Sequence, residues 1–186
     1  MTRRVAVAAA VLVGTAATGC GGSVAADPVA AEPRQSGDGR LVLVSGRDDH
    51  GMVVMRRVPA YDESTDEHAV ARIPDGTLAR VVEIDGQWLR VETVEGRSVT
   101  GWINDFYLRG EARLVGSPPS CRVRLASGRR EGGTLVVVRE LRGDQVLVET
   151  VTPPVVRDWA RRADLQELPP QGTGCGDIPP EDRHAH

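Results

Sequence analysis

The chain has 186 residues and a formal net charge of −3, so a basic surface that binds nucleic-acid backbones is not expected. Apolar residues make up 40% of the chain but aromatic residues only 3%, which predicts a core built from aliphatic side chains. The 21 glycines and 12 prolines are spread along the chain and predict many turns, short strands and no long helix beyond the N-terminus. Composition therefore favours an all-β fold without a nucleic-acid partner.

Residues 1–20, "MTRRVAVAAAVLVGTAATGC", have the three parts of an export signal peptide: two arginines, a short apolar run and small residues before a cysteine. The closing "ATGC" resembles the bacterial lipobox, although Ala17 stands where leucine is usual. The resemblance implies that Cys20 carries acyl chains such as palmitate and becomes the N-terminus of a lipoprotein. The protein would then be attached to the outer face of the cell membrane.

An alternative is cleavage after residues 24–26, "VAA", which would remove Cys20 and give a secreted protein. In either case residues 21–40 are small, polar and rich in glycine and proline. This composition predicts a flexible linker between the export segment and the folded part.

Cys121 and Cys175 are the two cysteines beyond the export segment. In an oxidising compartment a disulfide between them is expected. By closing the loop between them, it would raise the free energy of unfolding by about 4 kcal/mol. Two thiols without a partner are the alternative. A metal site is not expected, because no residues at ligand spacing surround either cysteine.

An internal repeat relates residues 76–93, "GTLARVVEIDGQWLRVET", to residues 133–150, "GTLVVVRELRGDQVLVET". The alignment has no gap and continues to the identical pairs Trp102/Trp159 and Leu108/Leu165. Self-similarity at a fixed offset indicates two repeated structural units.

The local pattern of the first copy predicts short antiparallel strands. Asp85 and Gly86 form a favoured hairpin turn, and Leu89 and Val91 are expected on the face of the next strand opposite Trp88. Residues 104–107 have the length of one 3₁₀ turn. A charged loop is predicted at residues 59–75, and strands are predicted at residues 52–58, 77–84, 87–94, 99–103 and 108–115. These elements make a small, bent antiparallel barrel.

The residues "GT", "GQWLRVET" and "GWINDFYL" of the first copy resemble the bacterial SH3 (SH3b) domain. The second copy departs from this pattern, because Gln145 replaces Trp88, Asp158 replaces Gly101 and "RRADL" replaces "NDFYL". The resemblance implies two tandem SH3-like barrels, the second of them degenerate. The expected organisation is a first domain at residues 41–114, a second with its tail at residues 120–175, and a disordered C-terminus at residues 176–186.

Sequence motifs of catalysis are not found. The chain has no nucleophile elbow, phosphate loop or zinc-protease motif, so neither an enzyme nor a cofactor is expected, and a hydrolase with an unrecognised site is the remote alternative. Residues 46–51, "GRDDHG", could in principle hold a metal, but a solvated turn is preferred. His184 and His186 are expected in a disordered tail.

Binding is the remaining class of function. The resemblance to SH3 domains implies a groove between the long loop, the hairpin turn and the 3₁₀ turn, where aromatic rings stack on an extended peptide or glycan. Phe106 is expected in the core, and for Trp102 the core and the groove are both expected places. The candidate ligand-binding residues are Tyr61, Asp62, Glu63, Trp88, Trp102, Asn104, Asp105 and Tyr107.

The expected function is therefore that of a non-enzymatic cell-envelope lipoprotein. Its first barrel would bind a peptide or the peptide stem of peptidoglycan, and the acidic loop "DESTDEH" would prefer a ligand that carries an amine. The alternative is an accessory protein that binds another envelope protein through the same aromatic face.

Overall fold

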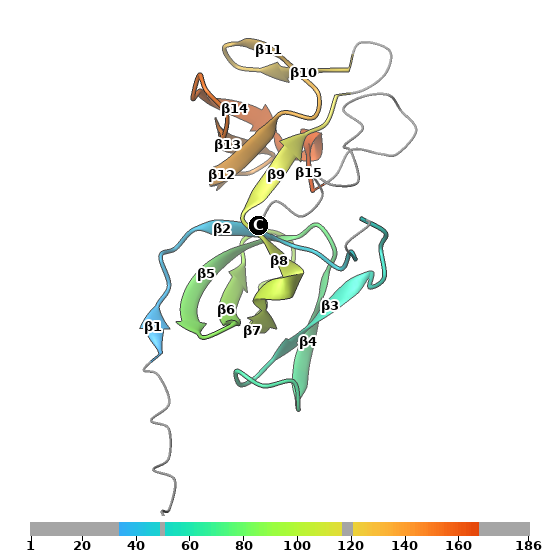
Figure 1. The fold of residues 1–186 in the computed structure, drawn as a ribbon, viewed down its shortest axis with the longest axis vertical. Coiled ribbons are helices and arrows are strands. Elements are labelled where there is room, and N and C mark those ends of the chain that lie inside the picture. The colour runs from blue at the N-terminus through green and yellow to red at the C-terminus, as the bar shows by residue number, and fades with distance from the viewer. Residues whose placement is uncertain (1–33, 49–50, 117–120, 168–186) are drawn as a thin grey trace, which may run out of the picture. The chain divides into compact units, whose positions relative to one another are not determined.

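The computed structural model describes residues 34–48, 51–116 and 121–167 (Figure 1). The described residues all belong to one compact part of the chain. This part contains two successive barrels, the first unit and the second unit. The predicted export segment with Cys20, most of the predicted linker, Cys175 and the C-terminal histidines lie outside the described residues. In the part that is described, no helix is long and apolar enough to cross a membrane.

The fold is all-β, as predicted, and its first half is an eight-stranded antiparallel sheet that bends into a half-barrel (Figure 1). A 3₁₀ turn, η1 (Asp105–Tyr107), directly follows strand β7 in the chain. A short strand β1 (Gln35–Ser36) pairs with β5. The other strands follow the order β4 (Ala69–Pro74), β3 (Arg57–Tyr61), β7 (Thr100–Asn104), β6 (Trp88–Thr93), β5 (Leu78–Asp85), β2 (Leu41–Val44) and β8 (Leu108–Arg109).

The second half repeats this arrangement in a smaller form. β10 (Arg122–Leu125) and β11 (Gly128–Glu131) form a two-stranded hairpin that is not hydrogen-bonded into the five-stranded antiparallel sheet of this half. The second 3₁₀ turn is η2 (Arg162–Asp164). The order in the sheet is β14 (Arg157–Arg161), β13 (Gln145–Thr150), β12 (Leu135–Arg142), β9 (Glu111–Leu114) and β15 (Leu165–Gln166). The elements from β5 to β8 and from β12 to β15 therefore recur in the same order, at the offset predicted from the sequence.

A shared hydrogen-bond pattern explains one of the identical segments of the repeat. Thr93 Oγ1 donates to the carbonyl of Arg97 at 2.8 Å and accepts from the amide of Val99 at 2.9 Å. Thr150 makes the same pair of bonds with Pro154 and Val156, at 3.1 and 2.8 Å. The threonine that ends both copies of the sequence match therefore fixes the turn between the last two strands of each meander.

The first strand of the barrel is not where the sequence predicted it. The expected strand at residues 52–58 begins only at Arg57, and Met52, Val53 and Val54 are exposed. Its role is taken by β2, which pairs with both β5 and β8. The predicted loop at residues 59–75 also contains most of β3 and all of β4. The four residues of β2 are all buried, so the strand has no alternating polar face by which to identify it.

The boundary between the two units falls at Gly110, four residues before the predicted end of the first domain. β8 pairs with β2 in the first sheet, whereas Glu111–Leu114 pair with β12 and β15 in the second. The crossing from the first unit to the second thus precedes β9. Ala112 and Leu114 belong to the core of the second sheet, which explains why the strand joins it.

The folded part also begins before the predicted C-terminal end of the flexible linker, residue 40. Gln35–Ser36 pair with β5, and the amide of Gly37 donates to the carbonyl of Val82 at 3.0 Å. A Cβ atom at Gly37 would come within 2.6 Å of the backbone carbon of Val82. Glycine at this position therefore lets the chain lie directly on the edge of β5.

Both central hairpins have two-residue turns, and the turn of the first is shifted by one residue from the predicted Asp85 and Gly86. Asp85 pairs with Trp88 and Arg142 pairs with Gln145, so the turns are formed by residues 86–87 and 143–144. Gly86 and Gly143 have φ angles of +56° and +59°, which a residue with a side chain rarely adopts.

The core consists of two hydrophobic clusters, one of which is shared by the two units. One cluster lies inside the first half-barrel and includes Val42, Val44 and Ile103. The other cluster contains the core of the second sheet together with Leu41, Leu43 and Leu78 of the first. β2 therefore packs against both units, with alternate side chains in the two clusters.

Candidate functional site: an aromatic groove on the first barrel

A groove of about 470 Å³ opens on the first barrel between the β3–β4 turn, the β5–β6 turn and η1. These are the three segments between which the sequence predicted a ligand groove. The lining residues are Tyr61, Thr65, Asp66, Gln87, Trp88, Asn104, Phe106 and Tyr107.

Two pairs of aromatic rings contribute to the groove. Tyr61 and Trp88 meet edge to face, with ring centroids 5.6 Å apart and an interplanar angle of 87°. Phe106 and Tyr107 form a second such pair at 5.1 Å and 88°. Phe106 is 46% exposed, and Tyr61, Trp88 and Tyr107 are half-buried. Rings supported by each other and still open to solvent can stack on flat or extended ligand groups.

The 3₁₀ turn that carries Phe106 and Tyr107 is fixed from several sides. Asn104 Oδ1 accepts from the amide of Phe106 at 3.1 Å and caps the turn. The amide of Asp105 donates to the carbonyl of Gln87 at 2.8 Å, which joins η1 to the β5–β6 turn. Arg109 Nη1 donates to the carbonyl of Phe106 at 2.6 Å. Asn104 therefore contributes to the groove both as a lining residue and as the cap.

The acidic loop at residues 62–68 forms one wall of the groove and is held by polar contacts. Asp62 Oδ2 lies 3.0 Å from His68 Nδ1. Ser64 Oγ donates to Asp85 Oδ2 at 2.6 Å, and Arg34 Nε donates to the same oxygen at 3.2 Å. The bond from Ser64, followed by the contact with Arg34, holds the pKa of Asp85 below its usual value of 3.8.

Four of the eight candidate residues line the groove together: Tyr61, Trp88, Asn104 and Tyr107. Asp62, Glu63 and Asp105 lie on the same turns but are not among the lining residues. The sequence missed Thr65, Asp66 and Gln87 as lining residues, although each stands in a turn that it had associated with the groove.

Phe106 is placed differently from the prediction, and Trp102, expected either in the core or in the groove, is buried outside the groove. Trp102 is only 3% exposed and does not line the groove, and the guanidinium carbon of Arg34 lies 5.2 Å from its ring centroid. Its neighbour Ile103 faces the core, so Trp102 points to the opposite side of β7. Phe106, expected in the core, is exposed because the 3₁₀ turn directs it outward.

The corresponding groove of the second unit has lost its aromatic pairs. It measures about 420 Å³ and is lined by Arg124, Leu125, Ala126, Gln145, Trp159 and Arg161. Gln145 and Arg161 stand at the positions of Trp88 and Asn104 in the repeat. The amide of Ala126 donates to the carbonyl of Trp159 at 3.1 Å. Trp159 corresponds to Trp102, which pairs with Tyr61 in the first unit, so Ala126 takes the place of Tyr61.

Gly101 of the first copy and Asp158 of the second occupy equivalent positions of the repeat, and the structure explains why the two residues differ. A Cβ atom at Gly101 would lie 2.9 Å from Cβ of Ala60, because β3 packs closely on β7 in the first unit. In the second unit the buried carboxylate of Asp158 accepts from the hydroxyl of Ser127 and, at 3.0 Å, from its amide. This carboxylate thus holds the short β10–β11 hairpin against β14.

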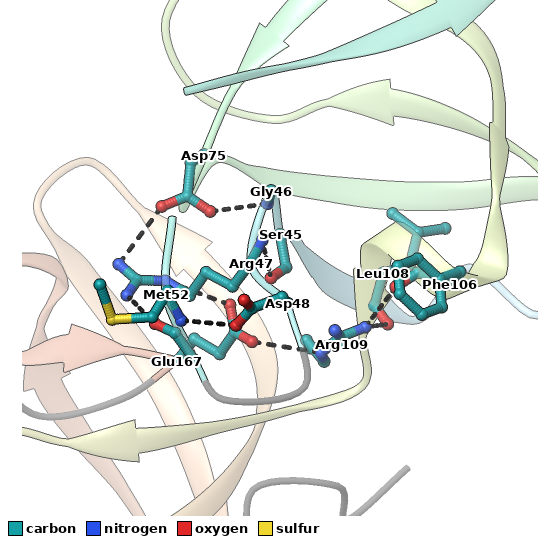
Figure 2. A network of polar contacts seen from close by, with 11 residues as sticks. Ser45, Gly46, Arg47, Asp48, Met52, Asp75, Phe106, Leu108, Arg109 and Glu167 are labelled. Atoms are coloured by element: carbon teal, nitrogen blue, oxygen red, sulfur yellow. Dashed lines mark hydrogen bonds and ion pairs between the residues drawn. The ribbon is translucent and has the colours of Figure 1, made fainter. Parts of the chain in front are cut away.

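Two charged contacts connect the second unit to segments that form grooves in the first. Arg162 Nε and Nη2 bond to the two oxygens of Glu95 at 2.8 and 2.6 Å, and Nη2 also bonds to the carbonyl of Gly76 at 2.6 Å. Glu167 Oε1 accepts from Arg109 Nε at 3.2 Å, and its other oxygen lies 3.6 Å from Arg47 Nε (Figure 2). Since Arg109 also bonds to Phe106, the second unit supports the 3₁₀ turn of the aromatic groove.

The other candidate segments show no comparable arrangement. In the segment at residues 46–51, Asp48 Oδ1 accepts from the amide of Met52 at 2.9 Å, and residues 49–50 lie outside the described residues (Figure 2). Among the described residues no group of three or more His, Cys, Asp and Glu could hold a metal ion. Cys121 is disulfide-bonded, and its predicted partner Cys175 lies outside the described part of the chain, so the pairing itself stays a prediction.

No protein-family model matches the sequence. No curated protein matches it either.

Proposed function

We propose that the chain is a non-enzymatic binding protein of the bacterial cell envelope, and that its first barrel binds an extended peptide in the aromatic groove. The observation that carries the proposal is the convergence of Tyr61, Trp88, Phe106 and Tyr107 from three turns on one groove of about 470 Å³. Exposed rings at a junction of turns suit a ligand with a repeating backbone and few large side chains.

The charge of the groove supports a ligand that carries an amine. Asp66 lines the groove, and the same loop also carries Asp62, Glu63 and Glu67, all exposed. No arginine lines the groove. The peptide stem of peptidoglycan is a peptide with free amine and carboxylate groups, and it is the ligand we propose.

The second barrel has a supporting role in this proposal. Its own groove has no counterpart of the Tyr61–Trp88 pair, whereas Glu167 and Arg162 bond to residues beside the grooves of the first barrel. The duplication therefore supplies a second packing surface and not a second recognition site.

The function is tested by co-sedimentation of the purified full chain with purified peptidoglycan. Trp88→Ala is expected to weaken binding about tenfold or more, because an aromatic side chain at the centre of a groove contributes about 2 kcal/mol. Phe106→Ala should weaken it too, with little loss of stability, since its ring is 46% exposed. Gln145→Ala, at the matching position of the second copy, is the control and should bind as the wild type does.

Binding that is unchanged in Trp88→Ala would overturn the proposal. A chain that fails to sediment with peptidoglycan but binds another envelope protein through Trp88 would favour the accessory-protein alternative. Circular dichroism of each variant confirms that the barrel is folded.

We propose further that the protein is exported and attached to the outer face of the membrane by acyl chains on Cys20. The sequence of residues 1–20 supports this, through its resemblance to a lipoprotein signal peptide. Intact mass spectrometry of the membrane fraction tests it. A mature chain that begins at Asp27 would contradict acylation and favour secretion.

A further inference from the structure

A second groove lies on the first barrel, between the edge strand β4 and the β6–β7 turn. Its volume is about 900 Å³, and none of its lining residues also lines the aromatic groove. The residues that line it are Arg57, Val70, Ala71, Arg72, Ile73, Pro74, Thr77, Thr93, Glu95, Gly96, Arg97, Ser98, Val99 and Thr100.

The groove has a net positive charge that the described residues do not neutralise. Arg57, Arg72 and Arg97 are exposed, and within the described ranges their guanidinium groups make no hydrogen bond or ion pair. Most other described arginines are paired with carboxylates or carbonyls, as the contacts of Arg162 and Arg109 illustrate. Three positive charges are thus collected in one groove without counterions.

The one carboxylate that lines the groove does not offset this charge. Glu95 accepts from Arg162 on both oxygens and from the amide of Leu78 at 2.6 Å. Its charge is therefore matched by an arginine outside the groove. A ligand that enters the groove meets three guanidinium groups and no carboxylate that needs a partner.

The wall that carries Arg97 is fixed before any ligand binds. Thr93, at the start of the β6–β7 turn, bonds to the carbonyl of Arg97 and the amide of Val99 near its end. The bond of Arg162 to Glu95 connects the same turn to the second barrel. A fixed wall loses little conformational entropy on binding, which favours affinity.

The opposite wall is a strand edge. β4 stands at the end of the sheet order, paired with β3 on one side only among the described strands. Val70 is 49% exposed on this strand, beside Arg72. An edge strand offers backbone donors and acceptors to another extended chain.

We infer that this second groove binds an acidic segment of another polypeptide in an extended conformation, added beside β4. Carboxylates of the segment pair with Arg57, Arg72 and Arg97, and apolar side chains of the segment contact Val70 and Val99. The polypeptide backbone is favoured over a phosphate polymer because only a peptide matches both the strand edge and the apolar floor. This site is separate from the aromatic groove and does not depend on the proposed function.

The test is fluorescence anisotropy of a labelled heptapeptide of alternating glutamate and valine, titrated with the purified full chain at low ionic strength. Arg72→Gln and Arg97→Gln are each expected to weaken binding about two- to fivefold, and the double variant roughly tenfold. Arg56→Gln is the matched control, because Arg56 is exposed beside Arg57 but does not line the groove. It should change the affinity less than twofold, as should Trp88→Ala.

Three further probes make the result decisive. A lysine–valine heptapeptide should not bind, and N-methylation of alternate peptide bonds in the acidic peptide should weaken binding strongly. Sodium polyphosphate should bind more weakly than the acidic peptide. Equal weakening by Arg56→Gln, a bound lysine peptide, or polyphosphate that binds as tightly as the peptide would each overturn the inference.

Discussion

Glu167, just after the last strand of the second barrel, accepts a hydrogen bond at 3.2 Å from Arg109 of the first barrel (Figure 2). Both side chains are only 13% exposed. Arg109 also donates at 2.6 Å to the carbonyl of Phe106, in the 3₁₀ turn of the aromatic groove. The relationship gives the degenerate second copy a defined task, which is to hold a groove-forming turn of the first.

Glu167→Ala should therefore destabilise the protein and weaken binding in the aromatic groove. The variant leaves the guanidinium of Arg109 largely buried without its carboxylate, so the free energy of unfolding should fall by about 2 kcal/mol. Urea denaturation measures the loss. Glu92→Ala is the control, because Glu92 is exposed and should cost less than about 0.5 kcal/mol. Equal losses in the two variants would contradict the supporting role of Glu167.

The bidentate contact between Arg162 and Glu95 should show a measurable coupling energy. Their side chains are 21% and 25% exposed, and both oxygens of Glu95 take part. A double-mutant cycle with Arg162→Gln and Glu95→Gln should give about 1 to 2 kcal/mol. The single ion pair of Arg90 and Glu83, 3.4 Å long and more exposed, should give about 0.5 kcal/mol or less. A coupling no larger than that of the exposed pair would mean that the contact does not stabilise the barrel junction.

Leu43→Ala should lower the stability of both barrels together. Leu43 is 2% exposed and belongs to the cluster that contains the core of the second sheet, although it lies on a strand of the first. Loss of its side chain should cost about 3 kcal/mol and preserve a single unfolding transition, which calorimetry would detect. Met52→Ala, at a site that is 57% exposed, is the control and should have little effect. Two separate transitions, with only one of them shifted, would contradict a shared core.

Asp85 should make part of the stability depend on pH in the acid range. Its pKa is lower in the folded chain than the usual value of 3.8, so its ionised form stabilises the fold above that value. This contribution is lost as the pH falls through the lower folded pKa. The stability difference between the wild type and Asp85→Asn should be constant above about pH 5 and shrink below 3.8.

The bond from Ser64 is the first cause of the lowered pKa, so Ser64→Ala should reduce this pH dependence. Urea denaturation between neutral and strongly acidic pH measures it. A stability difference that stays constant through the acid range would contradict the assignment to Asp85.

The sequence predicted the parts of the fold that depend on local patterns. The hairpin glycines Gly86 and Gly143, the alternation of Leu89 and Val91 against Trp88, and the 3₁₀ turn are all present, because each depends on a few neighbouring residues. The same reason explains why four of the candidate site residues lie together in one groove, whereas ligand binding by them stays a prediction. Tyr61, Trp88, Asn104 and Tyr107 lie in or beside turns whose order along the chain already placed them at one end of a barrel.

An all-β chain, a twofold repeat and the exchange of aromatic residues in the second copy can thus be read from the residues alone. The burial of β2 on both faces, the pairing of Glu111–Leu114 with the second sheet, and the burial of Trp102 beside an exposed Phe106 become visible in the folded chain. These outcomes depend on contacts between residues far apart in the chain, such as Leu43 with the second core and Arg109 with Glu167. Local periodicity reports which residues can be buried, but contacts between distant segments of the folded chain determine which of them are.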